Sequence, residues 1–126
     1  MLGHISFGVA DLSRSARFYD AVLSALGFVR VYASLKAVGY GVEGSADRLL
    51  LTEQPDATPP GPGFHLAFIA QTPAAVDAFH RAALTHGGTD NGPPGPRPHY
   101  GPDYYAAFVI DPDGYHLEAK YPPPRG

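Results

Sequence analysis

The sequence contains no cysteine and no tryptophan, and only 9 of its 126 residues are lysine or arginine. The lack of cysteine excludes disulfides and thiolate ligands, so any metal ion must be bound by histidine and carboxylate. With a formal net charge of −3 and no basic stripe, the chain is a poor candidate for binding nucleic acid or an anionic membrane. It also lacks an apolar run of membrane-spanning length and a signal-peptide pattern at its start. We therefore expect a cytoplasmic protein.

The length of 126 residues is enough for one domain with a hydrophobic core. Hydrophobic residues make up 44% and charged residues 17%, which is typical of a soluble globular protein. The sequence has 15 glycines and 14 prolines, and most of the prolines lie in segments 53–63 and 91–103, where they indicate turns between structured regions. We predict a single domain over 1–126, with module one at about 1–57 and module two at about 62–121.

The division into two modules is based on an internal repeat. The segment "GHISFGVADLSRSARFYDAVLSALGF" aligns with "FHLAFIAQTPAAVDAFHRAALTHGGT" at a shift of 61 positions. The matching pairs are His4–His65, Phe18–Phe79 and Gly27–Gly88 (65 − 4, 79 − 18 and 88 − 27). Three coincidences at one shift predict two copies of one structural unit.

Each module is expected to contain a strand, a helix and further strands. In module one we predict a strand at 4–9, a helix capped by Asp11 or Ser13, and strands at 28–33, 36–42 and 48–53. In module two we predict a strand at 65–69, a helix opened by Thr72 and Pro73, an irregular or edge strand within 89–100, and strands at 104–110 and 115–121 joined by the turn DPDG at 111–114. The helical core positions are Phe18, Val22 and Leu26 in the first helix, and Val76, Phe79, Ala83 and Leu84 in the second. The predicted fold class is α+β, with two βαβββ modules and one helix against each sheet.

Three strand-like runs each contain a titratable residue opposite their bulky apolar residues. These residues are His4 in "LGHISF", His65 in "GFHLAF" and Glu118 in "YHLEAK". Side chains alternate along a strand, so helices packed on the apolar faces would leave all three residues on the open side. Taken singly, each residue has an ordinary explanation as a surface histidine or an edge-strand charge. Together, two imidazoles and one carboxylate predict a site for Zn, Mn, Fe, Ni or Co with open coordination positions.

The segments "GHISFGVADLSRSARFYDAVLSALGF", "GFHLAF" and "DPDGYHLEAKY" resemble the vicinal oxygen chelate superfamily, which includes glyoxalase I, fosfomycin and bleomycin resistance proteins and extradiol dioxygenases. The resemblance implies paired βαβββ modules forming a curved mixed-sheet cup around a divalent metal. It places His4, His65 and Glu118 at the ligand positions of that cup. Glyoxalase I has a fourth ligand, and its position here falls on Leu50 or Leu51, so a glyoxalase I reaction is not expected.

The segment "NGPPGPRPHYGPDYY" supplies most of the other predicted site residues. Tyr100 and Tyr104 are candidate catalytic hydrogen-bond donors to a substrate oxyanion. The candidate substrate-binding residues are Arg97, Phe108, His99 and, from module one, Tyr40. Arg97 would pair with an anionic group or lie in solvent, His99 would act as a base or be exposed, and Tyr40 would line the cavity or pack within its strand.

Two functions remain open at this stage. The first is a metal-dependent enzyme, a lyase, transferase or dioxygenase, that chelates vicinal oxygens of a small-molecule substrate. The second is a metal-free protein of the bleomycin-resistance type that sequesters a small molecule; a protein whose main role is dimerisation is a third, weaker reading. The resemblance also implies a homodimer, with His4 from one subunit and His65 and Glu118 from the other at each interface site.

Overall fold

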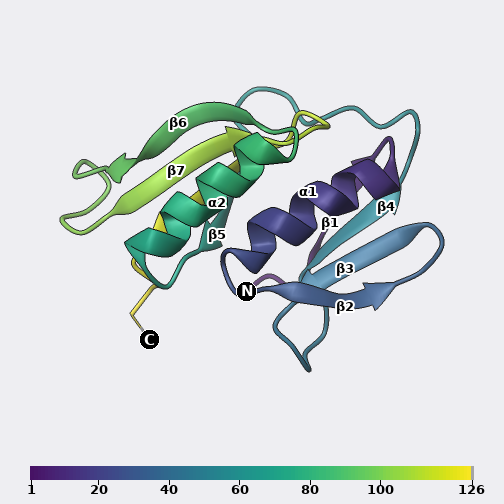
Figure 1. Ribbon diagram of the computed structural model, residues 1–126, viewed down its shortest axis with the longest axis horizontal. Coiled ribbons are helices and arrows are strands. Elements are labelled where there is room, and N and C mark those ends of the chain that lie inside the picture. Colours follow the sequence, from purple (N-terminus) through teal and green to yellow (C-terminus); the bar gives the residue numbers. More distant parts are fainter. Residues whose placement is uncertain (126) are drawn as a thin grey trace.

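The computed structural model describes residues 1–125, and they form two copies of one βαβββ module (Figure 1). Module one consists of β1 (Ile5–Val9), α1 (Leu12–Ser24), β2 (Val29–Ala33), β3 (Ala37–Gly41) and β4 (Leu49–Glu53). Module two consists of β5 (Leu66–Ile69), α2 (Pro73–Thr85), β6 (Thr89–Pro96), β7 (Tyr105–Ile110) and β8 (His116–Tyr121). The predicted α+β class and module order are confirmed.

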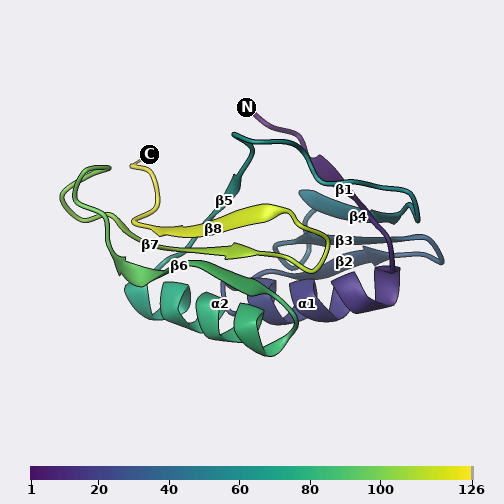
Figure 2. The same cartoon turned by 90° about the horizontal axis from the view of Figure 1, so that it is seen from above.

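Each module contains one four-stranded mixed sheet. The strand orders are β1-β4-β3-β2 and β5-β8-β7-β6, in which β1 runs parallel to β4 and β5 runs parallel to β8. Figure 2 shows α1 and α2 on the same side of the two sheets. The opposite faces of both sheets are therefore not covered by a helix, as the alternation of apolar and titratable residues predicted.

The internal repeat is visible in the helix boundaries. Both ends of α2 lie 61 residues after those of α1 (73 − 12 and 85 − 24). After the helices, however, the glycines with left-handed backbone are Gly27 (φ 90°) and Gly87 (φ 96°), so the predicted match of Gly27 with Gly88 is off by one residue. Gly88 has a different role, because a Cβ there would lie 2.8 Å from the Phe18 ring.

The caps and core of the helices follow the sequence pattern with one exception. Asp11, rather than Ser13, caps α1 by accepting a hydrogen bond from the Arg14 N–H at 3.1 Å, and Thr72 caps α2. The predicted core residues Phe18, Val22, Leu26, Val76, Phe79 and Ala83 are buried. The prediction for Leu84 is wrong, since this side chain is 46% exposed. It follows the buried Ala83 directly, and one residue turns the side chain about 100° around the helix axis.

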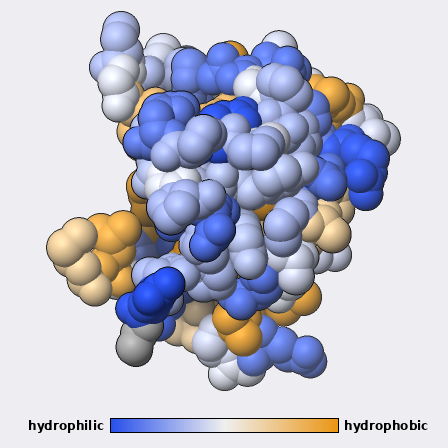
Figure 3. All heavy atoms as spheres, turned by 90° about the vertical axis from the view of Figure 1, so that its left-hand side faces the viewer, coloured by the Kyte–Doolittle hydropathy of each residue, from blue (hydrophilic) through white to orange (hydrophobic). Residues whose placement is uncertain are grey.

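Strand β6 is the irregular edge strand expected in the proline-rich segment. Its pairing with β7 shifts register between Asp90 and Gly92 and again between Gly92 and Gly95. Proline lacks the N–H that a regular ladder needs, which explains the irregular pairing. Figure 3 views the molecule from the left-hand side of Figure 1. This surface is predominantly hydrophilic, with smaller groups of apolar atoms. Within residues 1–125, no helix is long and apolar enough to cross a membrane.

The turn between β7 and β8 is hydrogen-bonded to module one through Asp113. Its carboxylate accepts from the Ala10 N–H at 3.0 Å, the Arg14 Nη2 at 2.7 Å and the Ser15 hydroxyl at 2.6 Å. The Asp113 side chain is only 8% exposed, whereas that of Arg14 is 42% exposed, so the charge-assisted bonds lie at the border between the interior and solvent. They hold the start of α1 and the tip of the β7–β8 hairpin together.

Asp111 makes a second, buried connection at the same turn. The Tyr19 hydroxyl donates to Asp111, and the carboxylate also accepts from the Asp113 and Tyr115 N–H groups at 2.8 and 2.9 Å. Burial raises the pKa of Asp111 above its ordinary value, although these hydrogen bonds act in the opposite direction. The adjacent Tyr115 ring stacks on Phe7 of β1 with centroids 4.1 Å apart. Polar and aromatic contacts together fix module two against module one.

We predict that Asp113→Asn lowers the free energy of unfolding by about 1–3 kcal/mol, because three donors lose a charged acceptor. Urea unfolding followed by circular dichroism measures this change. Asp103→Asn is the matched control, since Asp103 is exposed in the loop before β7. Equal stability of the two variants would contradict the role given to Asp113.

Candidate functional site

His65 and Glu118 meet on the face of module two that carries no helix. His65 lies directly before β5, and β5 pairs with β8 so that Ala67 is opposite Glu118. The His65 Nε2 atom is 3.1 Å from the Glu118 Oε1 atom. The Glu118 side chain is only 4% exposed, whereas that of His65 is 53% exposed. The pair therefore combines a buried carboxylate with an imidazole that is open to solvent.

Tyr104 binds the other oxygen of Glu118. It lies directly before β7, and its hydroxyl donates to Glu118 Oε2 at 2.6 Å. Burial, followed by the hydrogen bond and charge of Glu118, raises the pKa of Tyr104 well above its ordinary value. The phenol therefore stays protonated at neutral pH and acts as a hydrogen-bond donor. The structure places this predicted catalytic residue next to Glu118.

Phe108 lies across the β7–β8 ladder from Glu118, and its ring centroid is 6.3 Å from that of His65. Behind it is Gly92 of β6, with φ 148°, where a Cβ atom would come within 3.0 Å of the Phe108 ring. Gly92 was not among the site residues predicted from the sequence. Its only signal was a glycine inside an irregular strand, which indicates a close approach of the backbone to a neighbouring group.

Arg97 is close to the site, but its guanidinium is bonded to its own loop. Nη1 donates to the carbonyls of Gly95 and Pro96 at 2.8 and 3.3 Å, and Nη2 donates to that of Pro93 at 2.7 Å. The guanidinium carbon also lies 5.5 Å from the centroid of the Phe108 ring. Arg97 therefore stabilises the proline-rich segment behind Phe108, a role that the sequence did not reveal.

The remaining predicted substrate residues occupy different places. The Tyr100 ring is 5.3 Å from Tyr104 and 4.1 Å from His99, so these three residues form an aromatic group at the rim. Tyr40, in contrast, is 2% exposed, and its hydroxyl donates to Asp20 Oδ1 at 2.8 Å. Burial and this hydrogen bond raise the pKa of Tyr40. Tyr40 therefore packs within module one and also lines an apolar cleft between that module and β5, apart from His65 and Glu118.

His4 does not join His65 and Glu118 within one chain. In residues 1–125, no three histidine or acidic side chains come close enough to share a metal ion. His4 is exposed just before β1, beside a cleft that Leu66 and Phe68 also line. Within a single chain, the structure brings together two of the three predicted ligands.

The counterpart of Glu118 in module one is Leu50. Ser6 pairs with Leu50 in module one, and Ala67, 61 residues after Ser6 (67 − 6), pairs with Glu118 in module two. Leu51 is fully buried on the helix side. The sequence left Leu50 and Leu51 open, and the strand register identifies Leu50. A leucine cannot ligate a metal, so module one offers no carboxylate at this position.

His65 and Glu118 have the chemistry and spacing of two metal ligands. Two ligand atoms about 2.0–2.2 Å from one ion lie about 2.8–3.6 Å apart in tetrahedral or octahedral geometry. The observed separation of 3.1 Å falls in this range. Within the described chain, the Glu118 carboxylate has hydrogen-bond partners only in His65 and Tyr104, and no lysine or arginine lies within ion-pair distance. A buried carboxylate without a cation is costly, and a divalent ion would remove that cost.

Lys120 is a further residue at this site. It follows Glu118 by two positions in β8, on the same face, and its ammonium lies 5.1 Å from the centroid of the Tyr104 ring. The alternation of side chains along a strand is consistent with this shared face, but Lys120 was not among the site residues predicted from the sequence. The contact of Lys120 with Tyr104 could not be predicted from the sequence, because it depends on the conformation of the loop before β7.

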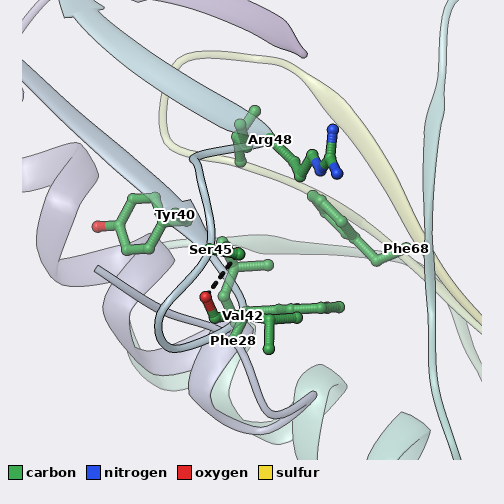
Figure 4. Close-up of a pocket in the computed structure, with 9 residues that line it drawn as sticks. Phe28, Tyr40, Val42, Ser45, Arg48 and Phe68 are labelled. Carbon is green, nitrogen blue, oxygen red and sulfur yellow. Dashed lines mark hydrogen bonds between the residues drawn. The ribbon is translucent and has the colours of Figure 1, made fainter. Parts of the chain in front are cut away.

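A mainly apolar cleft lies between module one and β5 of module two (Figure 4). Phe28 and Val42 from module one and Phe68 from β5 line it, and Arg48 extends beside Phe68. This cleft adjoins the one beside His4, because Arg48 and Phe68 line both of them. The seam between β1 and β5 is therefore an incompletely covered apolar region.

The chain is similar to several solved structures. A glyoxalase/bleomycin resistance protein from Albidiferax ferrireducens T118 is 38% identical, with 98% of this chain and 99% of that chain covered and a TM-score of 0.83. A glyoxalase-related enzyme from Fulvimarina pelagi is 23% identical over 100% and 92% of the two chains, with a TM-score of 0.75. The fosfomycin resistance protein FosX from Mesorhizobium loti is 21% identical over 98% and 92%, with a TM-score of 0.68. The last two show likeness of fold alone.

A search of curated proteins finds no match to the chain. The model of the Glyoxalase/Bleomycin resistance protein/Dioxygenase superfamily matches residues 1–119, which is nearly the whole sequence. The match includes both modules and the residues His4, His65, Tyr104 and Glu118. The chain belongs to the glyoxalase/bleomycin resistance protein/dioxygenase superfamily.

Proposed function

We propose that this chain is a cytoplasmic, metal-dependent enzyme acting on a small molecule, in which His65 and Glu118 bind a divalent ion together with His4 of a partner subunit. The observation that carries the proposal is the approach of His65 Nε2 to the buried Glu118 Oε1 at 3.1 Å, with no lysine or arginine within ion-pair distance of the carboxylate in the described chain. Zn, Mn, Fe, Ni and Co all accept this set of nitrogen and oxygen ligands.

The ion would supply Lewis acidity and open positions for two adjacent substrate oxygens. The surrounding side chains have separate tasks. Glu118 presents Oε1 beside His65, while the Tyr104 hydroxyl holds Oε2 and so orients the carboxylate. Because Tyr104 stays protonated, its hydroxyl is a donor that can move from Glu118 to a developing substrate oxyanion. Phe108 lies beside His65 and gives the site an apolar wall on that side.

The reactions suited to these groups are isomerisation, epoxide opening and oxygen insertion, and the proposed enzyme is a lyase, a transferase or a dioxygenase. Leu50 stands where a fourth, carboxylate ligand would be needed in module one. A site with three protein ligands leaves more positions for substrate than one with four. This difference argues against a glyoxalase I reaction.

The same proposal includes a homodimer with shared sites. Strands β1 and β5 are free edges of their sheets, and the seam between them is lined by apolar residues. Free edges and apolar grooves are costly to leave in water, and a second copy of the chain would cover both. Pairing β1 of one subunit with β5 of the other would bring His4 toward the partner's His65 and Glu118. The third ligand of each site would then come from the partner subunit, so a single chain need not bring all three together.

A metal-free binding protein is the second candidate. Its support is the hydrogen-bonded series from His65 through Glu118 to Tyr104, which is complete without an ion. The aromatic residues Phe108, Tyr100 and Tyr104 would then contact the sequestered molecule.

We predict that Glu118→Gln and His65→Ala each strongly lower the affinity for Zn²⁺, because each change removes a metal ligand. The loss should exceed the roughly 10- to 100-fold that is typical when only a hydrogen-bond partner of a ligand is removed. Calorimetric titration of the purified protein measures this affinity. His86→Ala is the matched control, because His86 is exposed at the end of α2. Zn²⁺ affinity that does not respond to Glu118→Gln or His65→Ala would favour the metal-free binding protein.

Tyr104→Phe is predicted to weaken Zn²⁺ binding by about 10- to 100-fold, since Glu118 Oε2 loses its only hydrogen-bond donor in the described chain. The same titration measures the loss. Tyr100→Phe serves as the comparison, because the Tyr100 ring lies 5.3 Å from that of Tyr104 and its hydroxyl makes no hydrogen bond to Glu118 in the described chain. An equal effect of both changes would contradict the orienting role of Tyr104.

Shared sites predict that two inactive variants complement each other. In a heterodimer of His4→Ala and Glu118→Gln subunits, one of the two sites receives His4 from the second subunit and His65 with Glu118 from the first. Zn²⁺ titration after refolding an equimolar mixture should therefore recover high-affinity binding that neither variant has alone. Absence of recovery in a mixture shown to contain heterodimers would contradict sites shared between subunits.

A further inference from the structure

Lys120 is positioned to interact with a ligand bound at Glu118. Both residues belong to β8 and lie on the face without a helix, and Lys120 is opposite Ala106 on β7. Because the side chain of Ala106 is small, the aliphatic part of the Lys120 side chain can lie over it. The ammonium then lies 5.1 Å from the centroid of the Tyr104 ring, whose hydroxyl binds Glu118.

The ammonium of Lys120 has no counterion in the described part of the chain. The ion pairs of residues 1–125 involve Arg14, Arg30, Lys36, His65 and His80, but not Lys120. Its side chain is only partly exposed. A cation above an aromatic ring gains a modest attraction, but an ammonium also has three N–H donors to satisfy. A ligand oxyanion would satisfy the charge and the donors together.

The other cation near this face is already bonded. Arg97 gives N–H groups to three carbonyls of its own segment and packs on Phe108. Recruiting it to a substrate would break bonds that hold the proline-rich segment. Lys120 can turn toward a ligand at the cost of one cation–π contact. Anion recognition at this site therefore falls to Lys120 rather than to Arg97.

We propose that Lys120 determines substrate specificity by binding an oxyanion group, such as a carboxylate, so that the substrate is a small organic anion. The inference rests on the proposed function, which places the substrate's two adjacent oxygens beside Glu118. Successive side chains on one strand face are about 6.6–6.8 Å apart. The oxyanion should therefore lie about 7 Å from the pair of adjacent oxygens.

Catechol and 3,4-dihydroxybenzoate form a matched pair of probes, because both carry two adjacent oxygens and only the second carries a carboxylate across the ring. We expect the wild-type protein loaded with Zn²⁺ to bind 3,4-dihydroxybenzoate about 10- to 100-fold more tightly than catechol, the range that a charged hydrogen bond provides. Lys120→Met should abolish this preference by weakening 3,4-dihydroxybenzoate alone, whereas Lys120→Arg should retain most of it. Calorimetric titration of each ligand measures the ratio.

Lys36→Met is the control, since it removes the same charge from a solvent-exposed position on module one and should leave the preference unchanged. Thermal unfolding verifies that each variant is folded, and Lys120→Arg supplies a test that keeps the cation. A preference that survives Lys120→Met, equal binding of the two probes by wild type, or binding of neither probe would overturn the inference.

Repeating the titrations without metal separates this inference from the proposed function. If Zn²⁺ does not bind but a Lys120-dependent preference for 3,4-dihydroxybenzoate persists, the anion site stands and the metal-dependent enzyme fails. If Zn²⁺ binds through His65 and Glu118 but Lys120→Met changes nothing, the metal site stands and the anion site fails.

Discussion

The hydrogen bonds of the β7–β8 turn are the contacts on which the arrangement of the two modules depends. Asp113 binds the start of α1 and Asp111 binds Tyr19, so two carboxylates from module two are satisfied by donors of module one. The same turn joins the strands that carry Phe108, Glu118 and Lys120. Since the aspartates are shielded from water, separating the modules would leave charged groups without partners. The candidate site is thus built on a hairpin whose tip is fixed.

The division of each sheet into two faces explains where this site lies. The helices pack on the faces that carry Phe7, Val9, Leu117 and Ala119, all of which are buried. Polar residues on those strands must then point to the opposite faces, because side chains alternate. Glu118 is nevertheless only 3% exposed, since His65, Tyr104 and Phe108 surround it. A carboxylate that is both outside the core and nearly inaccessible is unusual, and this combination distinguishes the site from an ordinary surface charge.

The local chemistry of the sequence predicted the periodic features well. Capping residues, helix boundaries and the faces of the strands depend on neighbouring residues, and the repeat at 61 positions reinforced each of them. The exceptions involve longer-range packing. Leu84 was assigned to the core although Ala83 already occupies that face, and Gly88 was matched to Gly27 although its role is to admit the ring of Phe18. Both errors arose because the sequence pattern shows where apolar residues and glycines occur but not the surface against which they pack.

Composition and pattern alone thus predicted the two modules, their helices and the shared face of His65 and Glu118, because side chains alternate in the same way along both strands. Three features depended on the tertiary structure. The loop before β7 brings Tyr104 to Glu118, the carbonyls of the proline-rich segment take the N–H groups of Arg97, and Lys120 is left above the Tyr104 ring. These contacts join segments that carry no common periodicity. Their geometry is decided by loop conformation and by competition among hydrogen-bond partners, which only the folded chain defines.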